Sequence, residues 1–223
     1  IVVLLIVGLV AYFSGAFSNS DLAKTVTYPA EIQQVADWNQ ECLEGLALEA
    51  VNVLGLQGGQ YIVDDQSYEF EGSKIPYTYY EGNNNLDSLE QIETSIGAYI
   101  AEKASSTCYY DNPYLEEFSL LVQDYNSEIK IELEEVALVI EYPMVAEVSE
   151  GNTFDITNPY EFVLPVRVGK TYVAAFNIVE ASVFEPNYFD YDWMLQQEVN
   201  TEILQMDDEN YVLLTPIKFI NKL

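Results

Sequence analysis

Histidine is absent from this sequence of 223 residues, and arginine occurs once, as Arg167. Without histidine the chain has no Ser-His-Asp or Cys-His nucleophile, no HExxH zinc site and no histidine acid/base catalyst. The sequence also lacks a G-x-S-x-G motif, a phosphate-binding G-x-G-x-x-G or Walker A loop, and the Asp-Thr-Gly or Asp-Ser-Gly of aspartic proteases. Carboxylate pairs are too abundant to single out a glycosidase site. We therefore expect no catalytic site.

Positive charge is scarce as well. The chain has 8 Lys and Arg against 37 Asp and Glu, which gives a formal net charge of −29. Nucleic acids and anionic lipid head groups are bound through Lys and Arg, so this composition argues against both as partners. A strongly acidic surface instead suits a habitat where salt or cations screen its self-repulsion. We expect an extracellular location.

Only two cysteines are present, Cys42 and Cys108, separated by 66 positions along the chain. They lack the C-x-x-C spacing of a redox or zinc site. Two interpretations remain open at this stage. The pair forms one disulfide, or both are buried free thiols, since free cysteine is among the most buried residue types.

The first 17 residues carry no charge and are apolar on every side. As a helix, residues 1–17 would span about 26 Å, the short limit for crossing a bilayer. Because an amphipathic surface helix would show a polar stripe, we expect lipid or other protein to surround this one. The chain starts inside the apolar run, with no basic flank, so we expect processing or truncation before Ile1. The residues assigned to this assembly or membrane helix are Ile1, Leu4, Leu5, Gly8, Leu9, Tyr12, Phe13, Gly15 and Phe17.

Residues 1–20 resemble mature type IV pilins and archaellins, in which cleavage exposes an apolar helix that packs in a filament core. Leu5 stands where bacterial pilins usually carry Glu, so the resemblance points to the archaeal type. The polar runs Ser18-Asn19-Ser20 and Thr25 to Pro29 interrupt the long continuous helix of that family. The stretches 41–59 and 75–82 look like uncharacterised membrane-anchored surface proteins of small-genome archaea, a likeness that implies no activity.

We expect a polar linker at 18–28 and one extracytoplasmic acidic domain at 29–223. Apolar residues at helical spacing predict a helix from Pro29 to Leu54, which Gly55 and Gly58-Gly59 end. Short strands are predicted at 60–63 and 75–80, followed by an Asn83 to Asn85 loop. Asp87 and Glu90 predict a capping box for a second helix over 89–104, which places Cys108 just past its end.

From residue 127 the apolar period changes to two. Half-buried strands are predicted at 129–133, 136–142 and 160–168, a helix at 172–183, and a hairpin of 201–206 with 211–215. Helices segregated from mostly antiparallel strands make the predicted fold class α+β.

Two groups of residues are candidate binding sites. Asp190 and Asp192, and Asp207 and Asp208, are oxygen-rich enough to suggest Ca²⁺, but neither pair matches the D-x-[DN]-x-[DN]-G loop, and solvated acidic turns are common. No other cofactor is expected. Aromatic residues near the Asn-rich loop suggest a face for a sugar or protein partner, with strand packing as the alternative. The residues of this face are Tyr77, Tyr79, Tyr80 and Asn84.

Together these features predict a non-enzymatic, pilin-like structural subunit of a cell-surface filament. Its apolar N-terminal helices would pack in the core and its acidic domains would lie outside. The alternative is a single-pass membrane-anchored surface domain for binding or adhesion, in which the same helix crosses the bilayer. In either case the partner reached through residues 1–17 is another copy of the chain or the membrane, and salt or cations are expected to accompany assembly.

Overall fold

A computed structural model of the protein describes residues 28–63, 65–70, 72–149, 151–185, 190–196, 202–205 and 211–214. The apolar segment 1–17 and nearly all of the predicted linker lie outside these residues. Tyr28, the last linker position, is half-buried against the domain core and accepts a hydrogen bond from the Thr157 backbone N–H at 3.3 Å. Within the described part of the chain, no helix has both the length and the apolar character needed to cross a membrane.

Two long helices form one layer of the domain. Helix α2 (Ala30–Leu56) starts directly after Pro29, and α3 (Leu89–Ala104) packs along it and continues into a π-helical turn, η1 (Ser105–Tyr109). Both long helices were predicted from the spacing of apolar residues. That spacing produces the buried stripe of α2, which consists of Ile32, Val35, Ala36, Asn39, Leu43, Leu46, Ala47, Ala50, Val51 and Leu54.

The predicted capping box of α3 is displaced by one residue. Ser88 Oγ accepts from the Gln91 backbone N–H at 3.3 Å, and Gln91 Oε1 accepts from the Ser88 backbone N–H at 2.7 Å. The assignment to Asp87 and Glu90 was therefore wrong. The helix begins one position later than the acidic residues suggested, and Ser-x-x-Gln satisfies the same two backbone donors.

Two small hairpins connect α2 to α3. Strand β1 (Ser67–Phe70) pairs with β2 (Ser73–Pro76), and β3 (Tyr79–Tyr80) pairs with β4 (Asn83–Asn84). The prediction of Asn83 and Asn84 as loop was wrong, because Glu81 and Gly82 have positive φ angles of 49° and 83° and close a tight hairpin turn. Residues 60–63 were predicted as a strand but are not one.

The second layer is a ribbon of six antiparallel strands. In sequence order they are β5 (Ser119–Val122), β6 (Asn126–Ile131), β7 (Val136–Glu141), β8 (Met144–Ser149), β9 (Asn152–Ile156) and β10 (Tyr160–Leu164). Their hydrogen bonds form two three-stranded sheets, β10-β7-β6 and β5-β8-β9. The chain passes from one sheet to the other three times, in each case across a break of only two or three residues.

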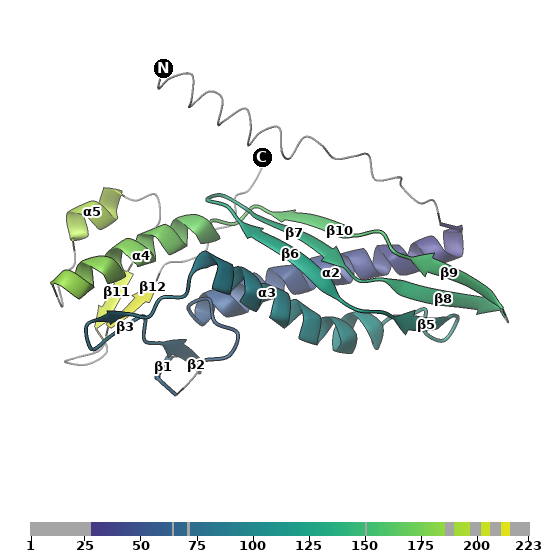
Figure 1. Cartoon of the computed structure of the whole chain (residues 1–223), viewed down its shortest axis with the longest axis horizontal. Coiled ribbons are helices and arrows are strands. Elements are labelled where there is room, and N and C mark those ends of the chain that lie inside the picture. Colours follow the sequence, from purple (N-terminus) through teal and green to yellow (C-terminus); the bar gives the residue numbers. More distant parts are fainter. Residues whose placement is uncertain are drawn as a thin grey trace, which may run out of the picture.

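These breaks lie at one level across the ribbon. Residues 123–125 separate β5 from β6, Tyr142 and Pro143 separate β7 from β8, and residues 157–159 separate β9 from β10. A hydrogen bond of 2.9 Å from the Gln123 backbone N–H to the Pro143 backbone oxygen joins two of the breaks. The two sheets are therefore the halves of one long, bent, three-stranded meander, which runs along α2 and α3 (Figure 1).

The core lies between the helices and this ribbon. Alternate residues of β7 and β10 point inward, as the period of two predicted, and are at most 7% exposed: Val136, Leu138, Ile140, Tyr160, Phe162 and Leu164. On the facing helix Asn39 is fully buried, and its Nδ2 lies 3.1 Å from Met144 Sδ and 3.5 Å from Tyr160 Oη. Helix α3 approaches β6 so closely that a Cβ on Gly97 would lie 2.8 Å from Ser127 Oγ.

The remaining elements gather at one end of the elongated domain (Figure 1). Helix α4 (Val168–Phe184) packs against β3 and β4, and α5 (Tyr191–Gln196) follows it in sequence. Strands β11 (Glu202–Gln205) and β12 (Tyr211–Leu214) form the predicted C-terminal antiparallel hairpin. Helices layered on antiparallel sheets confirm the α+β fold class.

Burial of tyrosines predicts a loss of stability in alkali. Removal from water raises the pKa of Tyr160 to about 12, and Tyr142 is shifted to about 12 for the same reason. Because an unfolded tyrosine ionises near pH 10, the folded state holds these protons more tightly. The unfolding free energy should therefore fall between about pH 10 and 12, by up to about 1.4 kcal/mol per pH unit for each phenol.

This expectation is checked by urea unfolding at a series of alkaline pH values, with tyrosinate absorbance recorded in parallel. Tyr160→Phe should flatten the pH dependence in this window, whereas Tyr110→Phe, at a phenol that is 72% exposed, is the matched control. If the unfolding free energy of Tyr160→Phe fell with pH as steeply as that of wild type, the loss of stability in alkali would not come from Tyr160.

Candidate functional site

The two cysteines form a disulfide that joins both long helical segments. Cys42 lies in the middle of α2 and Cys108 in η1, with a Cα–Cα distance of 5.6 Å. Neither cysteine is free, so the predicted pairing is confirmed and the interpretation as buried thiols is excluded. Cys108 is fully buried, whereas Cys42 is half-buried. The bond therefore fixes the end of α3 to the middle of α2.

A surface pocket of about 270 Å³ adjoins this disulfide. One wall comes from a single turn of α2, where Trp38, Glu41 and Cys42 share a face because residues three and four positions apart are neighbours on a helix. The other lining residues, Thr107 and Asp111, come from η1 and the turn after it. The pocket is open, its wall is almost wholly apolar, and it lies between the two segments that the disulfide joins.

The indole of Trp38 is held in place. Its Nε1–H donates a 3.2 Å hydrogen bond to the backbone oxygen of Cys108, across the disulfide from its own helix. Trp38 is half-buried, while Glu41 and Asp111 are exposed. An aromatic wall fixed by a hydrogen bond and a covalent cross-link is preorganised, which lowers the ordering cost of binding.

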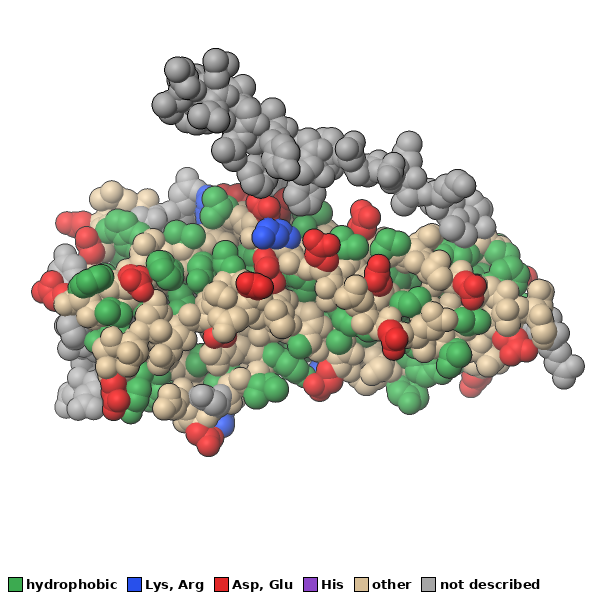
Figure 2. Space-filling model, in the orientation of Figure 1, with side chains coloured by type: hydrophobic (Ala, Val, Ile, Leu, Met, Phe, Trp, Pro, Cys, Tyr) green, Lys and Arg blue, Asp and Glu red, His purple; other side chains and the backbone are tan. Residues whose placement is uncertain are grey.

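Acidic side chains are spread over the surface of the domain. Figure 2 shows Asp and Glu across the whole face in view, and Lys and Arg at only a few places. This distribution agrees with the net charge of −29.

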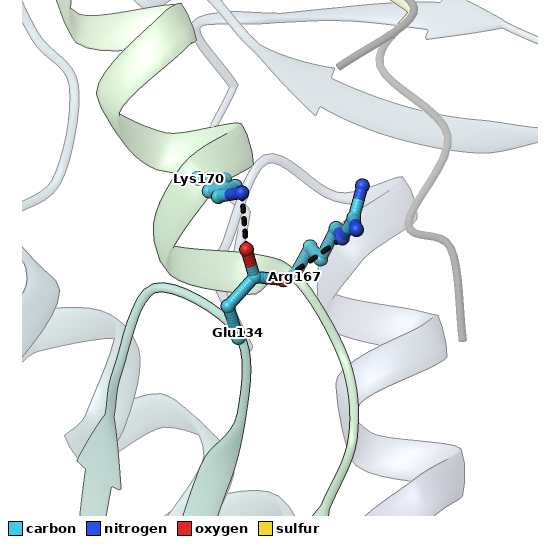
Figure 3. Close-up of polar contacts among 3 residues, drawn as sticks. All are labelled: Glu134, Arg167 and Lys170. Carbon is cyan, nitrogen blue, oxygen red and sulfur yellow. Dashed lines mark hydrogen bonds and ion pairs between the residues drawn. The ribbon is translucent and has the colours of Figure 1, made fainter. Parts of the chain in front are cut away.

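One ion-pair cluster lies where the β6–β7 turn meets the start of α4 (Figure 3). Glu134 Oε2 accepts a 2.9 Å hydrogen bond from Arg167 Nε, and Glu134 Oε1 pairs with Lys170 Nζ. The hydrogen bond from Lys170, with the charge of Arg167, holds the pKa of Glu134 below its ordinary value of 4.5. Because one carboxylate pairs with both cations, we interpret the cluster as a structural connection between the ribbon and α4.

Removal of this carboxylate should weaken that connection. Glu134→Gln leaves Arg167 and Lys170 without their shared anion, so the urea midpoint at neutral pH should fall slightly. The folded-state pKa is lowered, so the stabilisation is present above pH 4.5 and disappears as the pH falls through the folded pKa. The difference from wild type should shrink accordingly. Glu132→Gln, an exposed position in the same turn, is the control; an equal loss there would contradict a specific role for Glu134.

The four residues of the predicted aromatic face lie close together. The rings of Tyr77 and Tyr80 are 5.7 Å apart, and Tyr79 pairs with Asn84 in the β3–β4 register. The amide of Asn84 is already used inside the protein: Nδ2 donates to Glu180 Oε1 on α4 at 2.6 Å, and Oδ1 accepts from the Leu86 backbone N–H at 2.9 Å. Asn84 thus fastens the hairpin to α4, and only the tyrosines remain for a partner.

The calcium candidates fall partly inside the described residues. Asp190 accepts the Trp193 backbone N–H at 2.9 Å and so caps α5, in which Asp192 is exposed. Asp207 and Asp208 lie outside the described residues. In the part of the chain that the structure describes, no group of three or more His, Cys, Asp or Glu side chains is placed to hold a metal ion.

Sequence reasoning missed the pocket beside the disulfide. Trp38, Glu41 and Cys42 occupy one predicted helical turn, and pairing Cys42 with Cys108 brings Thr107 and Asp111 to the same place. The sequence therefore contained enough information to place these residues together, provided that the disulfide was assumed. Comparison with known proteins adds no further guide, because no protein-family model, curated protein or solved structure matches this chain.

Proposed function

We propose that this protein is a non-enzymatic structural subunit of a cell-surface filament, with its apolar N-terminal segments in the core and its acidic domains outside. The observation that carries the proposal is the disulfide between α2 and η1 in a strongly acidic domain. Disulfides persist in oxidising, extracytoplasmic compartments, which supports a location at or beyond the outer face of the membrane.

The position of the cross-link also suits a component that bears load. Helix α2 is the first described helix after the apolar segment, so tension applied through residues 1–17 reaches α2 before the rest of the domain. Ten of its residues are buried, and Cys42 bonds it covalently to the end of the α3 segment. Extraction of α2 from the domain would therefore expose a large apolar stripe and is opposed by a covalent bond.

The net charge opposes association between copies. Repulsion between domains that each carry −29 has to be screened, and the screening length falls from about 30 Å to about 10 Å between 0.01 and 0.1 M salt. Filaments should accordingly form only with added salt or multivalent cations.

A charge placed in the apolar segment tests this proposal. Leu9→Asp should abolish filaments seen by electron microscopy, because burying a carboxylate in an apolar environment is strongly unfavourable. Ser20→Asp, just beyond the apolar run, adds the same charge and should leave filaments intact. Deletion of residues 1–17 should leave a soluble, disulfide-bonded monomer, and fibres formed by that truncated protein would overturn the proposal.

The second candidate is a membrane-anchored surface domain for binding or adhesion, which the pocket beside the disulfide favours. Electron microscopy of sheared cell-surface material distinguishes the two. Filaments that contain this chain support the structural subunit, and their absence favours the anchored domain.

A further inference from the structure

Helix α4 carries apolar side chains on the side that faces away from the core. Val173, Phe176 and Phe184 are 43%, 40% and 84% exposed. Between them Asn177 is exposed and Glu180 is half-buried. The five residues share one face of the helix, because residues three and four positions apart are neighbours on its surface. We call them the α4 stripe; hydrophobic side chains gather over α4 at the left end of the domain in Figure 2.

The α4 stripe has little charge for so acidic a chain. Residues 171–179 contain no charged side chain. Glu180, the acidic residue of the stripe, already accepts a 2.6 Å hydrogen bond from Asn84 Nδ2. A contact between two α4 stripes therefore brings together fewer carboxylates than the average surface of a chain with a net charge of −29. Since like charges oppose association, copies of this chain approach each other most easily through this face.

The order of residues along the stripe favours an antiparallel pair of α4 helices. In a parallel pair the two Glu180 carboxylates would stand opposite each other, and like charges repel. An antiparallel pair centred between Asn177 and Glu180 instead places the amide of one copy opposite the carboxylate of the other, twice. It also places Val173 against Phe184 at both ends. An amide has two N–H groups, and Asn177 uses one at the Val173 backbone oxygen, so the second can serve this contact.

The stripe is too small to hold two separate domains together. Helix α4 has 17 residues, so it is about 26 Å long and about 10 Å across. One face of such a helix is well below the roughly 800 Å² per partner that stable interfaces bury. This size agrees with the monomer expected after deletion of residues 1–17. Copies arrayed along a filament would make the same weak contact many times, and repeated contacts between two arrays add up to strong binding.

We propose that the α4 stripe binds the α4 stripe of a second copy of this chain, antiparallel across a two-fold axis, and so joins neighbouring filaments side by side. A helical filament is built from head-to-tail contacts, so a two-fold contact between identical surfaces pairs two filaments instead of extending one. This inference rests on the proposed function, since separate copies do not associate through so small a face. Bundles require salt, because the acidic domains of both filaments have to be screened.

A charge placed in the stripe tests the contact. Phe184→Glu puts a carboxylate opposite Val173 in an apolar contact, and a side chain that is 84% exposed contributes little to the fold. Electron microscopy should show bundles of wild-type filaments and single filaments of Phe184→Glu at the same salt concentration. The fraction of filaments that sediments at low speed should fall about tenfold in the variant. Leu121→Glu on β5, at a leucine that is 65% exposed, makes the same charge change and should leave bundling intact.

Cross-linking tests the antiparallel arrangement. Filaments of Asn177→Cys and filaments of Glu180→Cys are assembled separately, one of them labelled with ¹⁵N, then mixed and oxidised with copper phenanthroline. Disulfide-linked pairs with one chain of each variant should be the main product, as identified by mass spectrometry. Pairs formed chiefly between two Glu180→Cys chains would indicate parallel helices and overturn the arrangement. The absence of mixed pairs would overturn the contact between filaments.

Further outcomes separate this inference from the proposed function. Bundles that persist in Phe184→Glu, or wild-type filaments that stay single at every salt concentration, overturn the α4 contact and leave the filament itself in place. A urea midpoint of Phe184→Glu that falls as far as that of a core substitution would mean that a segment of the same chain covers the stripe, which also overturns the contact. Failure of wild type to form any filament overturns the proposed function and this inference with it.

Discussion

Replacement of both cysteines by alanine should lower the unfolding free energy of the domain by about 4 kcal/mol. The bond between Cys42 and Cys108 closes a loop with a sequence separation of 66 residues. In the loop-entropy model, a disulfide that closes a loop of this length stabilises the folded domain by about 4 kcal/mol, because it lowers the conformational entropy of the unfolded chain. Urea unfolding of the full chain, compared with wild type, measures the loss.

The oxidised and reduced wild-type proteins provide the control. Cys108 is fully buried in the core, so the alanine variant also loses some packing. Reduced wild type keeps both side chains and lacks only the bond, and it should show most of the same loss. If reduction left the urea midpoint unchanged, the cross-link would contribute nothing and the load-bearing argument for α2 would lose its basis.

The two long helices could be predicted because each is specified locally. Apolar residues recur at helical spacing from Ile32 to Leu54 and from Leu89 to Ala104, and glycines or polar turns end each run. The disulfide was one of the two interpretations that the sequence left open, and the structure decides between them. The exact cap of α3 was wrong, because serine and acidic residues stand side by side at its start, and α2 continues through Gly55 to Leu56.

Only three of the six strands in the ribbon could be predicted from the sequence. Strands β6, β7 and β10 alternate clearly and were predicted, whereas β5, β8 and β9 were not. Pro143 and Pro159 lie at the breaks, and a proline usually marks the end of a strand. Each pair of successive strands forms one long strand because the three breaks lie side by side across the meander. That alignment depends on how the strands pair with one another, so it could not be predicted from any one segment of the sequence.

The pocket beside the disulfide could not be predicted from the sequence for a different reason. Its indole and carboxylates are ordinary members of an amphipathic helix, where Glu41 is expected on the solvent side and Trp38 at the margin of the apolar stripe. Nothing in one helical turn distinguishes them from other surface residues. They line a pocket only together with Thr107 and Asp111, which lie about 70 positions further along the chain and come close where η1 packs against α2.

Insertion of one methyl group at Gly169 should destabilise the domain by about 1–3 kcal/mol. Gly169 lies in the first turn of α4, where the β6–β7 turn approaches the helix backbone, and a Cβ would lie 2.4 Å from the backbone oxygen of Glu132 and 3.0 Å from the Cα of Leu133. Both contacts are with backbone, so no side-chain rotation relieves them. Relief would require the turn to move, which disturbs the hydrogen bond from the Lys170 backbone N–H to the Leu133 backbone oxygen at 3.3 Å.

Gly45→Ala is the matched control, because it makes the same substitution inside α2 at an exposed position with no atom within 4 Å of the added Cβ. At this position alanine should raise the unfolding free energy by about 0.5–1 kcal/mol, since glycine loses more backbone freedom than alanine when it enters a helix. The two variants should thus shift the urea midpoint in opposite directions from wild type. Equal midpoints for Gly169→Ala and wild type would contradict this prediction and mean that the turn moves away from the added methyl group at little cost in free energy.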